Sequence, residues 1–161
     1  MLGTVDVAGR MKGFMKAISK LVVIAVLACV VSVANARDSR EMYSIKEALN
    51  SEDAKAQLDG SVRFYFGNQK HPAVAKRHGE FMSNKKTNAF NKTDKRACEW
   101  AFLSAMLSFQ ERAQREGGNA VINIRSFYKR NKISSATEFE CGAGAVIAGV
   151  TFLGDVVTLA K

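Results

Sequence analysis

The sequence predicts an α+β fold in which one long helix packs on a small antiparallel sheet, with an additional helix closer to the N-terminus. Three observations predict it. Apolar residues recur at helical spacing across 94–116, β-rich apolar segments occupy 62–66, 120–128 and 137–159, and no linker separates them. This alternation is typical of one helix-on-sheet domain.

The first 36 residues have the three zones of a secretory signal peptide. Three lysines precede an apolar run over 21–33, and Ala34 and Ala36 suit a cleavage site. A membrane-spanning helix needs about 20 apolar residues, and this run is shorter. We therefore interpret 1–36 as a signal peptide cleaved after Ala36, 37–161 as a single domain, and the location as periplasmic or secreted.

Two alternatives for this segment stay open. Translation could start at Met1, Met11 or Met15, since either later methionine gives an ordinary positively charged start. Cys29 stands in a sequence that faintly resembles a lipoprotein box. The apolar run continues past Cys29, whereas a lipoprotein normally turns polar there, so lipidation is the weaker interpretation.

The first elements of the domain have clear boundaries. Ser44 and Glu47 match a capping box, which predicts one helix or two short ones over 44–58. The alternation at 62–66 predicts a half-buried strand. The next stretch, 67–93, has few apolar anchors and stays unassigned: it is either a long surface loop or hides a short strand near 86–90.

The second half is better defined. Thr93 or Asp94 can cap a helix that runs to Glu116. Gly117, Gly118 and Asn119 suit a structural turn in which the helix stops and the strand 120–128 begins. A basic turn, 129–132, follows. The segment 137–159 predicts further strands, with Gly144, Gly149 and Gly154 as bulges or turn points.

The domain has two cysteines, and both are expected to face the layer between helix and sheet. Cys98 shares the apolar face of the helix, and Cys141 alternates in phase with Phe139. In an oxidising compartment such a pair predicts a disulfide, Cys98–Cys141. Two buried thiols are the alternative. The cysteines and histidines match no zinc-site spacing, so no metal or other cofactor is expected.

Positive charge is concentrated in one segment. Residues 37–161 contain 20 Lys and Arg and 14 Asp and Glu, and the excess falls within 67–96. In the cell envelope the available anions are lipid headgroups, lipopolysaccharide, cell wall and acidic proteins. The candidate residues for an anionic partner are Lys70, Lys76, Arg77, Lys85 and Lys86. The alternative is a solvated charged loop.

Catalytic signals are weak. The sequence has no phosphate-binding loop, dinucleotide-binding glycine motif, nucleophile elbow or zinc-protease motif. His71 or His78 could act as a general base beside Glu80. This keeps a small periplasmic hydrolase as an alternative to a protein without enzymatic activity.

Several segments resemble a family of small exported proteobacterial proteins of unknown function. They are "VRFYFGNQKHP" (62–72), "NKKTNAF" (84–90), "ACEWAFLSAML" (97–107), "GGNAVINIRSFY" (117–128) and "EFECGAGAVIAGVTFLGDVV" (138–157). Proteins of this kind are often labelled excinuclease ATPase subunit. The sequence does not support that label, since it lacks a nucleotide-binding loop and its signal peptide would carry it away from nucleic acid.

The helix that ends before "GGNAV", with the later Cys- and Gly-containing strands, is also similar to the Rcs envelope stress-sensor lipoprotein domain and to YbjQ-like domains. This resemblance implies a disulfide-stapled helix-on-sheet fold used for interaction. We therefore expect an interaction module without enzymatic activity, concerned with envelope stress or maintenance, that presents its basic segment to an anionic partner. Self-assembly through strand edges into a structural envelope protein is a further alternative.

Overall fold

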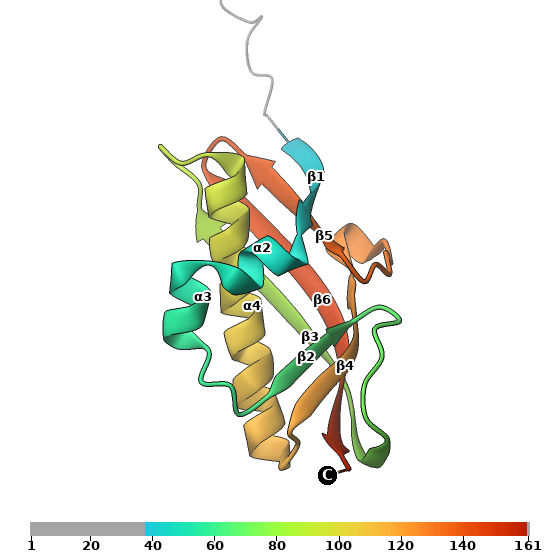
Figure 1. The fold of residues 1–161 in the computed structure, drawn as a ribbon. Coiled ribbons are helices and arrows are strands. Elements are labelled where there is room, and N and C mark those ends of the chain that lie inside the picture. The colour runs from blue at the N-terminus through green and yellow to red at the C-terminus, as the bar shows by residue number, and fades with distance from the viewer. Residues whose placement is uncertain (1–37, 161) are drawn as a thin grey trace, which may run out of the picture. The chain divides into compact units, whose positions relative to one another are not determined.

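The computed structural model describes residues 38–160, which belong to one compact unit, Arg37–Lys161. A curled six-stranded sheet carries the long helix α4 (Asp94–Glu116) along one face (Figure 1). The predicted α+β class, with one long helix on a sheet, is confirmed. The predicted signal peptide, its cleavage site after Ala36 and Cys29 lie outside the described residues.

The central strand of the sheet is β6, which is the last strand in the chain and is mostly buried. The strands are β1 (Asp38–Ser44), β2 (Arg63–Phe66), β3 (Val74–Asn88), β4 (Ala120–Ser126), β5 (Glu138–Gly144) and β6 (Ile147–Leu159). β3 pairs with the whole of β6 on one side. On the other side β5 pairs with the start of β6, and β4 pairs with its second half. β1 extends the sheet beyond β5, and β2 extends it beyond β4.

The sheet is mixed, whereas the sequence predicted an antiparallel one. β2 and β4 pair in parallel, and the other pairs are antiparallel. Parallel neighbours need a long crossover. Here β3 and α4 lie between β2 and β4 in the chain and supply that crossover. Local patterns in β2 carry no information about the direction of its partner.

The core lies between α4 and the sheet. Thr93 caps the helix by accepting a hydrogen bond from the Arg96 N–H, and Gly117 ends it in the left-handed conformation, at φ 74°. Phe102 of α4 and three phenylalanines of the sheet, Phe66, Phe139 and Phe152, form a cluster of stacked, tilted and edge-on rings. The predicted disulfide is present: Cys98 and Cys141 are joined at 2.08 Å and tie α4 to β5.

Two strands had no clear signal in the sequence. The segment 67–93, expected to be a loop or to hide a short strand near 86–90, contains the 15-residue strand β3. β3 pairs with β6 alone and is mostly exposed, so its buried side needs few apolar residues. β1 was not predicted at all, because its sequence, "DSREMYS", has no apolar alternation.

The remaining elements follow the sequence closely. The region 44–58 forms two short helices, α2 (Ile45–Asn50) and α3 (Glu52–Gln57), capped by Ser44 and Ser51. The predicted basic turn begins with a short 3-10 helix, η1 (Tyr128–Arg130). Gly149 lies within continuous β3–β6 pairing, so the expectation of a bulge or turn there was wrong. Gly144 ends β5 at the hairpin, and Gly154 lies opposite a register shift in β4, where Asn123 has φ 52°.

Candidate functional site

The face of the sheet opposite α4, called here the outer face, changes character along β6. At the end near the C-terminus it carries a small apolar cluster of Ala120, Ile122, Val157 and Leu159. In the middle, Arg125 pairs with Glu80, and Arg77 lies 3.9 Å from Asp155. At the other end the face is hollowed, and this hollow is the candidate site.

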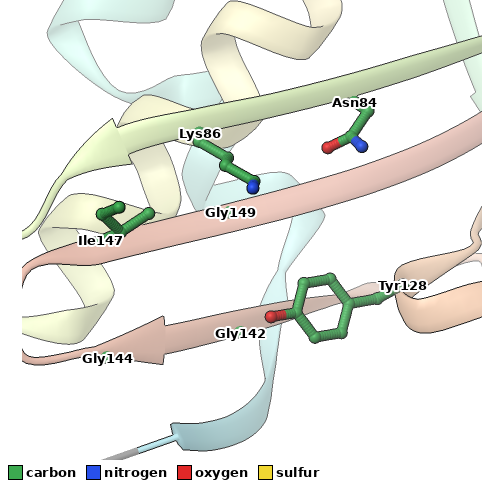
Figure 2. Close-up of a pocket in the computed structure, with 7 residues that line it drawn as sticks. All are labelled: Asn84, Lys86, Tyr128, Gly142, Gly144, Ile147 and Gly149. Atoms are coloured by element: carbon green, nitrogen blue, oxygen red, sulfur yellow. The ribbon is translucent and has the colours of Figure 1, made fainter.

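The hollow has a volume of about 220 Å³ and a floor of glycines. Its lining is drawn in Figure 2 and consists of Asn84, Lys86, Tyr128, Gly142, Gly144, Ile147 and Gly149. Lys86 extends over β6 at Gly149, and the ring of Tyr128 lies across β5 at Gly142. Four separate elements, β3, η1, β5 and β6, therefore contribute to one site.

The glycines make room for the two side chains that form the walls. A Cβ at Gly142 would lie 2.0 Å from the phenol oxygen of Tyr128. A Cβ at Gly149 would lie 3.2 Å from Cγ of Lys86. A side chain at position 142 would push the ring away from the sheet, and one at position 149 would crowd the lysine stem and the Lys85 carbonyl oxygen. The glycines thus permit the placement of Tyr128 and Lys86.

Tyr128 is held in place by its own turn and by neighbouring cations. The two residues after it, Lys129 and Arg130, adopt left-handed backbone with φ 48° and 65°. Such a conformation costs about 1–2 kcal/mol for each non-glycine residue and often accompanies a functional constraint. The Arg40 guanidinium lies 5.6 Å from the ring centroid, and the Lys129 ammonium lies 5.7 Å from it.

Arg40 also lies close to a buried carboxylate. Glu140 is 5% exposed, and its Oε1 lies 3.9 Å from the Arg40 guanidinium. Its other oxygen, Oε2, has no hydrogen-bond partner among the described residues. Glu140 and Arg40 partly balance one another, which leaves Lys86 as the charged side chain that lines the hollow.

Three polar groups in the hollow have unused hydrogen-bonding capacity. Within residues 38–160, the Lys86 ammonium, the Asn84 amide and the Tyr128 phenol make no hydrogen bond to another side chain or to the backbone. No acidic side chain lines the hollow. An ammonium with neutral donors beside it can bind a phosphate or carboxylate through charge-assisted hydrogen bonds. The arrangement therefore suits a small anionic group.

The structure distributes the five predicted anion-binding residues over a long distance. Lys86 borders the hollow, whereas Lys76 and Arg77 lie at the opposite end of β3, about 30 Å away at the rise of a strand. Lys85 pairs with Val150, on the α4 side of the sheet. Lys70 lies in the coil before β3. The charge that is clustered in sequence is therefore not one compact patch.

The cations at the far end of β3 are partly neutralised. Arg77, Gly79, Glu80, Asp155 and Val156 line a smaller hollow of about 190 Å³. Arg77 faces Asp155 there, and Glu80 binds Arg125. These contacts join opposite charges and leave less positive potential for a partner.

The two histidines lie outside the hollow. The Nδ1 of His71 is 2.8 Å from the carbonyl oxygen of Pro72, and its ring meets Tyr65 edge-on. The Nε2 of His78 is 2.9 Å from the Thr158 hydroxyl. Neither ring contacts a carboxylate in the described part of the chain. The predicted structural turn lies at the C-terminal end of α4, with Gly117 as its left-handed residue and the Asn119 side chain bonded to the Leu159 backbone.

Sequence reasoning missed most of the hollow. Asn84, Tyr128 and Gly142 were not candidates. A weak signal was present, since Gly142, Gly144 and Gly149 flank an apolar hairpin in which a strand would normally carry larger side chains. The side chains that these glycines accommodate, Tyr128 at Gly142 and Lys86 at Gly149, come from other elements.

A larger hollow lies beside α2 and is lined by Ser44, Ile45, Lys46, Leu49, Asn50, Gln69, Ala136 and Thr137. It contains one charged side chain. Between residues 38 and 160, no three His, Cys, Asp or Glu side chains gather as a metal site. Over the same range no helix has the length and apolar character needed to cross a membrane. A search of protein-family models, of curated proteins and of solved structures finds no match to this chain.

Proposed function

We propose that this chain is an interaction module of the cell envelope, without enzymatic activity, that binds an anionic group of an envelope component at the Tyr128 hollow. Its role in this proposal is envelope stress or maintenance. One observation carries the proposal: Lys86, Asn84 and Tyr128 converge on a glycine floor with no carboxylate in the lining. The group bound is a phosphate or a carboxylate.

The surrounding framework supports a fixed binding site. β3 and β6 pair over the whole length of both strands, and the disulfide ties β5 to α4. A site on rigid strands loses little conformational entropy when a ligand binds. The Tyr128 turn adds strained backbone that keeps the phenol over β5. These features favour recognition of a ligand by a preformed surface.

The alternative of a small hydrolase receives less support. His71 and His78 are the two histidines, and each has a neutral oxygen as its hydrogen-bond partner. A general base is normally oriented by a second group and faces a cleft. Neither His71 nor His78 lines the Tyr128 hollow.

The proposal is tested by binding of the Arg37–Lys161 unit to three anionic probes: phosphatidylglycerol vesicles, lipopolysaccharide and peptidoglycan. Lys86→Gln combined with Tyr128→Phe removes the charge and the phenol donor. We expect this variant to lose about tenfold or more in affinity for the probe that binds, as removal of charged hydrogen bonds usually does. Phosphatidylglycerol offers phosphate, peptidoglycan offers carboxylate and lipopolysaccharide offers both, so the comparison of the first two separates the sources.

Lys76→Gln is the matched control, because it removes a lysine at the far end of the same strand that has no ion-pair partner within residues 38–160. We expect it to have a small effect. Equal losses of affinity for Lys76→Gln and Lys86→Gln would mean that general charge attraction, and not the hollow, binds the probe. Unchanged binding after reversal of Lys70, Lys76, Arg77, Lys85 and Lys86 to glutamate would overturn the proposal.

A further inference from the structure

One end of the sheet carries large apolar side chains in open solvent. Phe90, in the turn between β3 and α4, is 60% exposed, and Val146 and Ile147, in the β5–β6 hairpin, are 58% and 55% exposed. The Ala89 N–H donates to the Val146 carbonyl oxygen at 2.7 Å, so the two turns lie side by side. Both turns lie at the same end of the molecule in Figure 1. We call Phe90, Val146 and Ile147 the apolar tip.

The composition of the hairpin is unusual for a turn in water. Hairpin turns favour Gly, Asn, Asp and Ser, but here Ala145, Val146 and Ile147 follow Gly144 and all three are exposed. The second turn is conventional by comparison, with the Phe90 N–H bonded to Asn88 Oδ1 and Asn91 in left-handed backbone. Exposed apolar residues that break local rules commonly mark an interaction surface.

Two lysines lie near this tip. The Lys92 ammonium donates to the Asn88 carbonyl oxygen, which places it at the turn beside Phe90. Lys86 precedes Asn88 by two residues and has no carboxylate partner among the described residues. The nearby carboxylate of Asp94 lies at the base of the turn, within 3.4 Å of the Ser39 hydroxyl.

We propose that the apolar tip inserts into the interface of an anionic lipid bilayer, with Lys86 and Lys92 at the level of the headgroups. Apolar side chains gain free energy by leaving water, and lysines close to an anionic surface add attraction. This arrangement is the usual one for peripheral membrane binding. The inference shares the anionic partner with the proposed function and names a bilayer as its source. Lys86 and Ile147 belong to both, whereas Phe90, Val146 and Lys92 do not line the hollow.

Charge complementarity selects the bilayer over a second copy of the chain. Two copies docked tip to tip would bring Lys86 and Lys92 of each copy toward the lysines of the other. Like charges brought together in this way destabilise an interface. An anionic surface instead pairs with both lysines while it covers all three apolar side chains.

The test compares sedimentation of the Arg37–Lys161 unit with vesicles of phosphatidylglycerol and phosphatidylethanolamine, and with vesicles of phosphatidylcholine. We expect binding to the anionic vesicles, decreasing as salt rises. Phe90→Ser and Val146→Ser together are expected to weaken it by about tenfold or more, because two apolar side chains that do not line the hollow no longer leave water. Met82→Ser is the matched control, since Met82 is 59% exposed on the outer face away from the tip.

A second measurement detects insertion directly. In a chain with Trp100→Phe, the variant Val146→Trp should shift its fluorescence to shorter wavelength with anionic vesicles. An unchanged spectrum, or equal binding by the double serine variant and wild type, would overturn the inference. If Lys86→Gln with Tyr128→Phe abolished binding while the serine variant bound as wild type does, the partner would bind at the hollow and not at the tip. A mass in solution that fell from dimer to monomer in the serine variant would assign the tip to self-association instead.

Discussion

The phenol oxygen of Tyr128 occupies the space that a side chain at position 142 would need. A Cβ built at Gly142 would lie 2.0 Å from this oxygen and 2.2 Å from the ring carbon that carries it. The two residues belong to different elements, η1 and β5, and lie 14 residues apart in the sequence. The glycine therefore determines whether the ring can rest on the sheet and form the wall of the hollow.

Replacing Gly142 with alanine should displace the Tyr128 ring. The clash involves the far end of a side chain, which can rotate away, so we expect a loss of about 1 kcal/mol in the free energy of unfolding. Binding of an anionic probe should fall by more than this, because the hollow loses a wall. Urea unfolding, the NMR shifts of the ring and a binding titration measure the three effects.

The control is the same substitution in a chain with Tyr128→Ala. Without the ring, Gly142→Ala should produce no further change in stability or binding, since the contact is already absent. A double-mutant cycle isolates this contact. If Gly142→Ala cost as much without the tyrosine as with it, the ring would not be the reason for the glycine.

The two glycines that end α4 should respond differently to substitution. Gly117 has φ 74° and no atom within 4 Å of a Cβ, so Gly117→Ala should cost about 1–2 kcal/mol and Gly117→Asn less. At Gly118 a Cβ would lie 2.9 Å from the Val157 carbonyl oxygen, which is backbone and cannot rotate away. Gly118→Ala should therefore be the more destabilising of the two.

Urea unfolding of Gly117→Ala, Gly117→Asn and Gly118→Ala measures these differences in stability. If Gly118→Ala left the free energy of unfolding nearly unchanged, that result would contradict the close packing of the turn against β6. Equal losses for Gly117→Ala and Gly117→Asn would mean that the backbone conformation is not the cause at position 117, because asparagine tolerates it better than alanine does.

The sequence predicted the elements whose chemistry is local. The helix α4, its cap and its glycine stop depend on residues close in the chain, and so do the strands β4 and β6 with their β-branched residues. The disulfide was predictable because Cys98 and Cys141 each lie on an apolar face of an assigned element. To predict these features it was enough to know the periodicity of the apolar residues and to expect an oxidising compartment.

The strand β3 and the hollow could not be predicted in the same way. β3 is an edge strand whose side chains are mostly wet, so apolar alternation is absent. The hollow depends on the β3–β6 register, which sets Lys86 opposite Gly149, and on η1, which brings Tyr128 over Gly142. Both are tertiary relationships, and no local pattern encodes them.

Removing the disulfide should cost much of the stability of the fold. The bond closes a loop of 43 residues, for which the chain-entropy relation gives about 4 kcal/mol. Alanine is the suitable replacement for both Cys98 and Cys141, because each is buried and a serine hydroxyl would need a partner. Urea unfolding of the double alanine variant, against wild type with and without reductant, measures the loss. A change below about 1 kcal/mol would contradict this role of the bond.

The ion pair between Glu47 and Lys95, on α2 and α4, should give a measurable pH dependence. The ammonium lies 2.6 Å from the carboxylate. Its hydrogen bond, and then its charge, lower the pKa of Glu47, and the same two effects from Glu47 raise the pKa of Lys95. A lowered carboxyl pKa stabilises the fold above the ordinary value of 4.5, and this contribution is lost as the pH falls through the folded pKa. A raised lysine pKa stabilises the fold below 10.5, and this contribution is lost as the pH rises through the folded pKa.

NMR titration should therefore find the Glu47 pKa restored toward its ordinary value in Lys95→Gln, with Lys46→Gln as the control on the same short helix. Because both groups are exposed, the effect on stability should be small, and an unchanged Glu47 titration in Lys95→Gln would show that the contact does not persist in solution.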